Sequence, residues 1–399
     1  MEIKGKINTA IAYAKVIEDE AIEQIRRMCD YELSTGSKIR IMPDVHAGAG
    51  CTIGTTMTIK DKVVPNIVGV DIGCGMYTIK LKESEIDFAR VDDIAHRIPS
   101  GRNVWDSSQK EFDLTCLRCY DKLRNPDRLR KSLGTLGSGN HFIELDKSSD
   151  CTNYLVIHTG SRNLGKQVAE YYQHLAIELA TGKEYFARER ERIVCEYKAA
   201  DRQNEIQNAL KELSGMELKH EIPDDLCYVF GESMEDYLHD IVVCQQFATA
   251  NRELIADKIL EYCGLTMVSS FHTVHNYINT DEMILRKGAI AAHKNEQVLI
   301  PINMRDGSIL AKGRGNPEWN YSAPHGAGRI MSRRTARASL DMDEYQKSMQ
   351  GVYTTSVNNG TIDEAPMAYK SINDILGVVE ESVDVIDILR PIYNFKASE

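Results

Sequence analysis

The chain has no apolar run of transmembrane length, and its start does not resemble a signal peptide. Its first residues read MEIKGK, which is not the apolar stretch that a secretory signal requires. The ten cysteines are spread over 399 residues without the spacing of a disulfide framework. We therefore expect a cytoplasmic protein that has no membrane partner.

An excess of positive charge is also missing, because the formal net charge is −11 at pH 7. A protein that binds nucleic acid through overall charge would usually be basic, so a polyanion would need a local patch or metal ions. Two basic stretches are present, Arg118 to Lys131 and the group Arg329, Arg333, Arg334 and Arg337. Taken alone, each is more simply explained as a solvated helix face.

No linker rich in Gly, Ser or Pro and no internal repeat divides the chain. Strand-like and helix-like patterns alternate, which predicts an α+β fold. We expect one large domain over residues 1–399, with mixed β-sheets around a metal-containing cleft and a helical insertion at about 165–263. The charged segment from Phe186 to Leu213 is expected to project into solvent.

Several elements follow from apolar periodicity. Asp19 to Cys29 should be a helix, and residues 266–312 should be rich in strands. Val63 to Val70 reads as a buried strand. Helices are also predicted over Phe112 to Lys131 and Ile372 to Leu389.

Glycine-rich loops that carry a histidine are the most informative feature. In SAPHGAGR, residues 322–329, glycines follow His325 as in a phosphate-binding loop, but the P-loop lysine and hydroxyl are absent. His325 is therefore either an ordinary buried polar group or a residue that does chemistry on a phosphate. His46, His141 and His158 lie in similar loops, and His275 lies at the edge of a strand-like run.

The stretch VDIGCGM brings a carboxylate, Asp71, within three residues of a thiol, Cys74. With imidazoles from elsewhere they would form a mixed O, S and N site, which suits Zn²⁺, Mn²⁺, Fe²⁺ or Co²⁺ rather than Mg²⁺ or Ca²⁺. Alone, Cys74 is more simply a core residue. The pair Cys116 and Cys119 lacks a second ligand pair, so we do not expect a zinc site there.

The stretch MPDVHAGAG contains Asp44 and His46, which would share one face of a strand. Asp44 could then orient a catalytic group or an imidazole ligand. The alternative is a polar turn that stabilises its own backbone.

Seven motifs, in one order along nearly the whole chain, resemble the RtcB family of RNA ligases: MPDVHAGAG…TIG, VGVDIGCGM, LGTLGSGNHFIE, IHTGSR, HNY, HGAGR and APMAYK. The resemblance implies an enzyme that joins an RNA 3′-phosphate or 2′,3′-cyclic phosphate to a 5′-hydroxyl with GTP and two Mn²⁺ ions. A histidine would be guanylylated, GMP would pass to the RNA 3′-phosphate, and the 5′-hydroxyl would displace it.

The resemblance also implies a role for individual residues. His325 would be the nucleophile and Asp44 the residue that orients it. The metal ligands would be Asp71, Cys74, His141, His158 and His275. The nucleotide would be bound by Asn140, Glu144, Asn276, Gly326, Gly328 and Lys396. Arg162 and Arg329 are candidates for binding the RNA phosphate.

Two other functions are compatible with this resemblance. An enzyme that caps RNA 3′ ends with guanylate without sealing them would keep His325 and the ligands. A non-catalytic RNA-binding protein on the same fold would have no need of a thiolate, a carboxylate and three imidazoles together. The sequence leaves open whether the RNA is a spliced tRNA or a cleaved RNA under repair, whether an activating protein partner is needed, and the oligomeric state.

Overall fold

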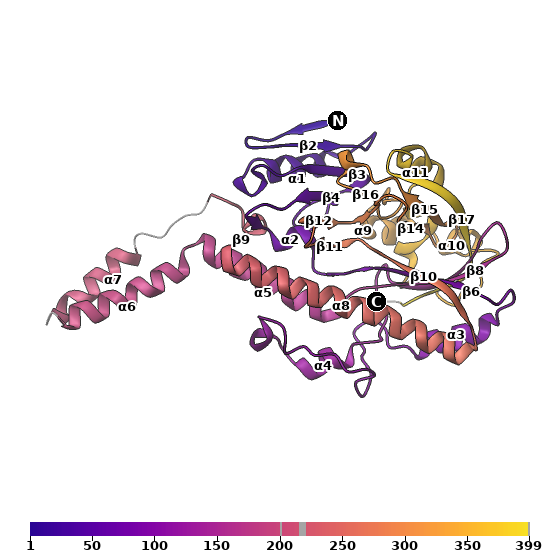
Figure 1. Cartoon of the computed structure of the whole chain (residues 1–399), viewed down its shortest axis with the longest axis horizontal. Coiled ribbons are helices and arrows are strands. Elements are labelled where there is room, and N and C mark those ends of the chain that lie inside the picture. The colour runs from indigo at the N-terminus through magenta and orange to yellow at the C-terminus, as the bar shows by residue number, and fades with distance from the viewer. Residues whose placement is uncertain (200–201, 215–220, 398–399) are drawn as a thin grey trace.

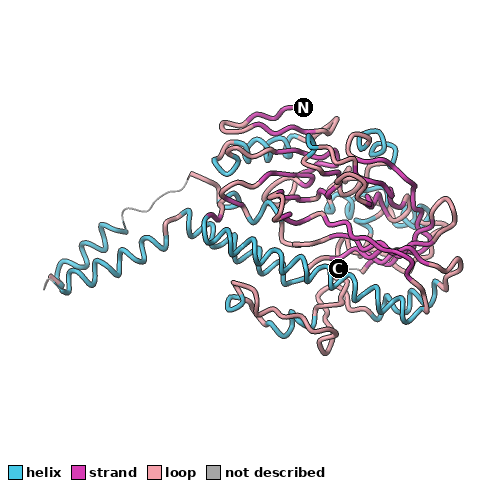
Figure 2. The backbone as a smooth tube through the Cα atoms, viewed as in Figure 1, coloured by secondary structure: helices cyan, strands magenta, loops and turns pink. Residues whose placement is uncertain are grey.

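The computed structural model describes residues 1–199, 202–214 and 221–397. Two main sheets dominate them (Figures 1 and 2). The six-stranded sheet has the order β1 (Glu2–Lys4), β2 (Thr9–Ala12), β3 (Ile39–His46), β4 (Ile53–Thr58), β12 (Ile284–Lys287), β11 (Asn276–Asn279). The seven-stranded sheet has the order β10 (Met267–Val274), β6 (Gly75–Leu81), β8 (Asn153–Thr159), β7 (Phe142–Lys147), β17 (Val383–Lys396), β15 (Gly307–Gly313), β14 (Gln297–Asn303).

Two small ribbons complete the strands, β13 (Ala289–Ala291) with β16 (Ser322–Pro324), and β5 (Lys62–Val63) with β9 (Val229–Phe230). The helices of the described residues are α1 (Asp19–Cys29), α2 (Pro65–Val68), α3 (Phe88–Arg97), α4 (Pro126–Lys131), α5 (Arg162–Ala180), α6 (Lys183–Ala199), α7 (Ile206–Ser214), α8 (Gly231–Cys263), α9 (Arg333–Ser339), α10 (Met342–Ser348) and α11 (Ile372–Val379). The mixture confirms the predicted α+β class.

The long helices α5 and α8 pack against each other and run alongside the sheets (Figure 1). Buried apolar residues of both helices join those of α1 and the six-stranded sheet in one core cluster. The C-terminal part of α8 packs, together with α3, against the seven-stranded sheet in a second cluster. The apolar faces of these helices thus hold the two sheets in place, which is what positions the strand ends described below.

The helical hairpin of α6 and α7 projects away from the sheets (Figure 1). This confirms the expectation that the charged segment from Phe186 to Leu213 reaches into solvent, although residues 200–201 lie outside the described residues. The buried residues of this hairpin include Ile193 of α6 and Leu213 of α7. None of the described helices is both long and apolar enough to cross a membrane.

The predicted helix over Asp19 to Cys29 is confirmed with the same bounds. Ala21, Ile25 and Met28 are buried on one face. Acidic residues in the first turn and basic residues in the last turn favour the helix dipole. The strand-rich region from 266 to 312 is also confirmed, as β10 to β15.

Three predicted elements are wrong. Val63 to Val70 is not a strand, because Pro65 occupies the first position of the short helix α2. Phe112 to Lys131 is mostly irregular, with a 3-10 turn at Tyr120–Lys122 and the short α-helix α4. Asn125, in a left-handed conformation, precedes α4 and accepts a hydrogen bond from Arg128 N. The helix predicted from Ile372 to Leu389 ends at Val379. The β-branched run that begins at Val383 pairs instead as β17.

Candidate metal centre and nucleotide cavity

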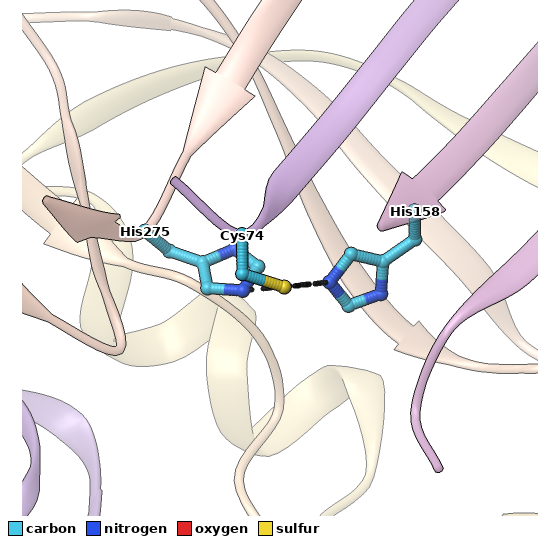
Figure 3. Close-up of side chains that lie close together, drawn as sticks. All are labelled: Cys74, His158 and His275. Atoms are coloured by element: carbon cyan, nitrogen blue, oxygen red, sulfur yellow. Dashed lines mark hydrogen bonds between the residues drawn. The ribbon is translucent and has the colours of Figure 1, made fainter. Parts of the chain in front are cut away.

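Cys74, His158 and His275 come together at the ends of strands of the seven-stranded sheet (Figure 3). Cys74 precedes β6, His158 is the last residue but one of β8, and His275 follows β10. The Cys74 Sγ atom lies 3.4 Å from His158 Nε2, which lies 3.4 Å from His275 Nε2. All three side chains are buried, and their ligand atoms lie within 4.8 Å of one another.

A second group shares the same sulfur. His141 Nε2 lies 3.4 Å from Cys74 Sγ and 2.9 Å from Asp71 Oδ2, and these three ligand atoms again fall within 4.8 Å of one another. The structure thus brings together all five residues expected to bind metal. Cys74 belongs to both groups, so its sulfur is the ligand atom that they share.

Backbone carbonyls determine which imidazole nitrogen is free. His141 Nδ1 lies 2.9 Å from the carbonyl oxygen of Leu136, and His158 Nδ1 lies 3.1 Å from that of Asn140. A carbonyl only accepts, so Nδ1 of each ring carries a proton, and Nε2 of each ring faces the Cys74 sulfur. This is the orientation that second-shell carbonyls give to metal-binding histidines.

The electrostatics favour uncharged imidazoles at His158 and His275 and an ionised carboxylate at Asp71. Burial lowers the pKa of His158 and of His275 well below the usual value. Burial alone would raise the pKa of Asp71, but the hydrogen bond and charge of His141 outweigh it and lower that pKa to about 2. Burial raises the pKa of the Cys74 thiol, so metal binding must displace a proton from it. The sulfur, nitrogen and oxygen donors together fit Mn²⁺, Zn²⁺, Fe²⁺ or Co²⁺.

A buried arginine of α8 ties the ligand-bearing segments together. Arg252 is fully buried, and its guanidinium donates to the carbonyl oxygens of Gly73, at 2.7 Å, and Thr159, at 2.9 Å. These carbonyls adjoin Cys74 and His158 in the chain. Arg252 therefore fixes the two segments relative to each other and adds positive charge beside the thiol.

His325 follows β16 and faces the same centre. Its Nδ1 lies 2.7 Å from Oδ2 of Asp44, and its backbone N–H donates to the same oxygen at 3.2 Å. The ring centroids of His325 and His275 are 5.0 Å apart. Gly328 has φ of +74°, and a Cβ there would lie 2.8 Å from the carbonyl oxygen of Asp44. The loop can therefore approach Asp44 only with glycine at position 328. The Asp44 carboxylate in turn binds Nδ1 of His325 and leaves Nε2 free.

A cavity of about 260 Å³ opens beside His325, His158 and His275. All the residues expected to bind the nucleotide line it: Asn140, Glu144, Asn276, Gly326, Gly328 and Lys396. Arg329 also lines it. Arg162 does not, and its guanidinium instead donates to Gly101 O at 2.9 Å and to Thr135 Oγ1 at 3.2 Å.

One wall of the cavity is built around a buried carboxylate. Glu364 is 2% exposed and accepts from Lys396 Nζ at 2.6 Å and from Tyr369 Oη at 2.7 Å. It also pairs with Arg333 at 2.6 Å and Arg329 at 3.3 Å. Burial alone would raise the pKa of Glu364, but Lys396 and Arg333 outweigh it and lower that pKa to about 2. One ionised carboxylate therefore holds three cations at the cavity wall.

The sequence had not singled out Glu364, Arg333 or Phe142 as cavity residues. Phe142 directly follows His141 in β7, and the Lys396 ammonium lies 5.7 Å from the centre of its ring. Tyr369 lies within the motif APMAYK and was given no role. Alternation along β7 could have indicated that Phe142 and Glu144 share one face, whereas nothing local indicates the partners of Glu364.

Glu144 and Asp146 form a second buried acidic pair beside the cavity. Asn394 Nδ2 donates to Glu144 at 2.6 Å. Burial, the largest influence, raises the pKa of Glu144 to about 7, and it also raises the pKa of Asp146. A carboxyl of Glu144 that keeps its proton near neutral pH can donate a hydrogen bond into the cavity.

Comparison with known proteins agrees with this geometry. The family model described as tRNA-splicing ligase RtcB matches residues 30–120 and 119–397. The RNA-splicing ligase RtcB of Escherichia coli K12 is 28% identical over 397 residues, which cover 89% of this chain and 88% of the relative. The tRNA-splicing ligase RtcB of Aeropyrum pernix is 25% identical over 85% of this chain and 83% of the relative. The tRNA-splicing ligase RtcB of Thermococcus kodakarensis is 24% identical over 88% of this chain and 86% of the relative. Because the family model spans nearly the whole chain, including every motif described above, the chain belongs to the RtcB family.

Proposed function

We propose that this protein is an RNA ligase that joins a 3′-phosphate or 2′,3′-cyclic phosphate end to a 5′-hydroxyl end with GTP. The observation that carries the proposal is the position of His325. Its Nδ1 is held by Asp44 at 2.7 Å, its Nε2 is free, and it faces one cavity with His158 and His275 of the candidate metal centre. The names of the relatives, RNA- and tRNA-splicing ligases, support the same class of reaction.

Two Mn²⁺ ions would be held by Asp71, Cys74 and His141 on one side and by Cys74, His158 and His275 on the other. When bound, they would supply positive charge that stabilises the phosphates during transfer. In a chain with a net charge of −11, such local charge is what allows a triphosphate and an RNA end to meet.

His325 is the nucleophile of the first step. Its Nε2 attacks the α-phosphorus of GTP, a P–N bond forms, and the P–O bond to pyrophosphate breaks. Asp44 accepts a hydrogen bond from Nδ1–H and stabilises the positive charge that develops on the ring. Gly326 and Gly328 leave space for the phosphates beside the ring.

The RNA enters in the second and third steps. An oxygen of the RNA 3′-phosphate attacks the α-phosphorus, the P–N bond breaks, and an RNA 3′-pp-G end results. The 5′-hydroxyl then attacks the RNA 3′ phosphorus and GMP leaves. A cyclic phosphate is first opened by water. Arg329, at the cavity wall, and Arg162, beside Asp71, are our candidates for binding the RNA phosphate.

The nucleoside would lie near the cavity wall that Glu364 and Lys396 form. Asn140, Glu144, Asn276 and Lys396 offer donors and acceptors there. Lys396 is held by Glu364, so its ammonium is fixed before a nucleotide arrives. Pre-organisation of this kind favours one base over another.

The test is to incubate the protein with Mn²⁺ and α-labelled GTP, beside His325→Ala and an α-labelled ATP control. We expect label on the denatured wild-type protein through a bond that acid breaks and alkali spares, and none on the variant. RNA with 3′-phosphate and 5′-hydroxyl ends should then be joined. Label without joining would indicate an RNA-capping enzyme, and no label on metal-loaded wild type would refute the proposal.

A further inference from the structure

His46 is the one glycine-loop histidine that the proposed reaction leaves without a role. It ends β3, two residues after Asp44, and is partly buried. It lines the cavity that contains His325 and also a second cavity of about 890 Å³. Among the lining residues, His46 and Arg329 are common to both. His46 therefore stands where a group entering through the second cavity would meet the reaction centre.

The second cavity has the size and chemistry to admit a nucleic-acid end. Its volume lies in the range of sites that enclose small organic ligands. Lys15, Lys370 and Arg329 line it, beside the small residues of the loop that follows His46. Three carboxylates also line it, those of Glu18, Glu20 and Asp374. Glu18 accepts from Ala47 N at 2.6 Å, and Asp374 accepts from Ser371 in the capping box of α11.

The protonation of His46 is determined by its own strand. Its Nδ1 lies 3.0 Å from the carbonyl oxygen of Asp44, which can only accept, so Nδ1 carries the proton and Nε2 has the lone pair. Burial lowers the pKa of His46, against smaller opposing contributions from Asp44 and Glu18, while His325 lowers it further. The second cavity adds the charged residues Lys15, Glu20, Arg329, Lys370 and Asp374, and the first cavity adds Glu144, Arg333, Glu364 and Lys396. At neutral pH His46 is thus an uncharged base.

The sealing step needs a base in a different place from His325. The 5′-hydroxyl attacks the RNA 3′ phosphorus, one phosphate removed from the α-phosphorus that His325 attacks. In an in-line displacement the hydroxyl enters opposite the departing GMP, whereas His325 lies on the GMP side. The base must therefore sit beside the path of the incoming strand.

We propose that His46 is the general base of the sealing step, taking the proton of a 5′-hydroxyl whose strand enters through the second cavity. The 5′-oxygen forms a bond to the RNA 3′ phosphorus as the P–O bond to GMP breaks. The proton passes to Nε2 of His46 and from there to solvent through the second cavity. This inference rests on the proposed ligase function and adds a catalytic residue to it.

The test separates sealing from the earlier steps. His46→Asn keeps an amide nitrogen that can still donate to the Asp44 carbonyl, so the loop is preserved while the base is lost. His174→Asn, at an exposed histidine of α5 whose side chain is 69% exposed, is the matched control. Each protein is given Mn²⁺ and a purified RNA with a 3′-pp-G end, beside a 5′-hydroxyl RNA, and formation of the protein–GMP adduct is measured separately.

We expect His46→Asn to form the protein–GMP adduct at the wild-type rate and to seal the activated RNA at least about 100-fold more slowly, the usual loss for a general base. The wild-type sealing rate should fall at acidic pH, as His46 gains a proton, and the variant should lack this fall. Equal sealing by variant and wild type would overturn the inference, and so would equal loss of adduct formation and sealing. Failure of the wild type itself to seal the activated RNA would overturn the ligase function and this role with it.

Discussion

Arg252→Met should destabilise the protein and weaken metal binding together. The arginine is fully buried and donates to two buried carbonyls, those of Gly73 and Thr159. Methionine fills similar space but leaves both carbonyls without this donor. Each buried acceptor left unpaired costs about 1–3 kcal/mol, so we expect a loss of about 4 kcal/mol.

The expected change in melting temperature follows from chain length. Unfolding entropy is about 2.1 cal/mol/K per residue, or about 0.8 kcal/mol/K for a chain of 399 residues. A loss of about 4 kcal/mol therefore lowers the Tm by about 5 °C. Because Gly73 and Thr159 adjoin Cys74 and His158, Mn²⁺ affinity should fall by about 10- to 100-fold, as for other groups that orient metal ligands.

Calorimetry of the metal-free protein measures the first effect, and isothermal titration with Mn²⁺ measures the second. Arg252→Lys is the matched variant, since its ammonium keeps the charge and can still reach one carbonyl. It should fall between wild type and Arg252→Met in both measurements. If Arg252→Met melts within about 1 °C of wild type, the two hydrogen bonds do not hold these segments as argued.

Three further predictions concern the candidate metal ligands and the cavity beside them. Cys74→Ala should abolish binding of both Mn²⁺ ions. His141→Ala should keep the ion held by Cys74, His158 and His275, because only the sulfur is shared between the two groups. Metal analysis that finds the same number of bound ions in the two variants would contradict this. Gly160→Ala should weaken Mn²⁺ binding at least about tenfold, since its Cβ would lie 2.6 Å from Cγ of Asp71. Gly377→Ala, where a Cβ meets nothing within 4 Å, is the control, and equal affinity of the two variants would refute the argument. Burial raises the pKa of Glu144 to about 7, so the folded protein holds this proton more tightly than the unfolded chain. The stabilising contribution of this proton is present below about pH 4.5 and is lost as the pH rises through about 7. In metal-free buffer, the Tm of Glu144→Gln relative to that of the wild type should therefore increase between these two pH values. A Tm difference that stays constant would contradict the argument.

The five-residue ligand set came from the family resemblance. Local patterns supported four of its members, Asp71, Cys74, His141 and His158, which lie in glycine-rich loops, whereas His275 lies at the edge of a strand-like run. Glycine context separated His141, His158 and His325 from the exposed helical histidines such as His174. Their convergence was not accessible from local patterns. It depends on β6, β8 and β10 being neighbours in one sheet, which only the tertiary fold or the family resemblance supplies.

The errors have a common physical origin. In the segment 383–389 the apolar and β-branched residues are compatible with either a helix or a strand, and pairing with β15 determines that they form a strand. The role of Glu364 was missed for the same reason, since Lys396 and Arg333 reach it from other parts of the chain. Local propensity is overruled where a residue's partners are distant in sequence.

The place of β17 in the seven-stranded sheet has a consequence for how the protein is made. This strand lies between β7 and β15, and all other strands of that sheet precede it in the chain. During synthesis the sheet therefore remains in two parts, with two open edges, until residues 383–396 have left the ribosome. Unpaired edges of this kind invite association with other chains, and pairing across large sequence separations is slow. The newly made chain should thus depend most on chaperones until β17 has paired. The cavity beside His325 is also incomplete until then, because Asn394 and Lys396, which line it, belong to the strand that closes the sheet.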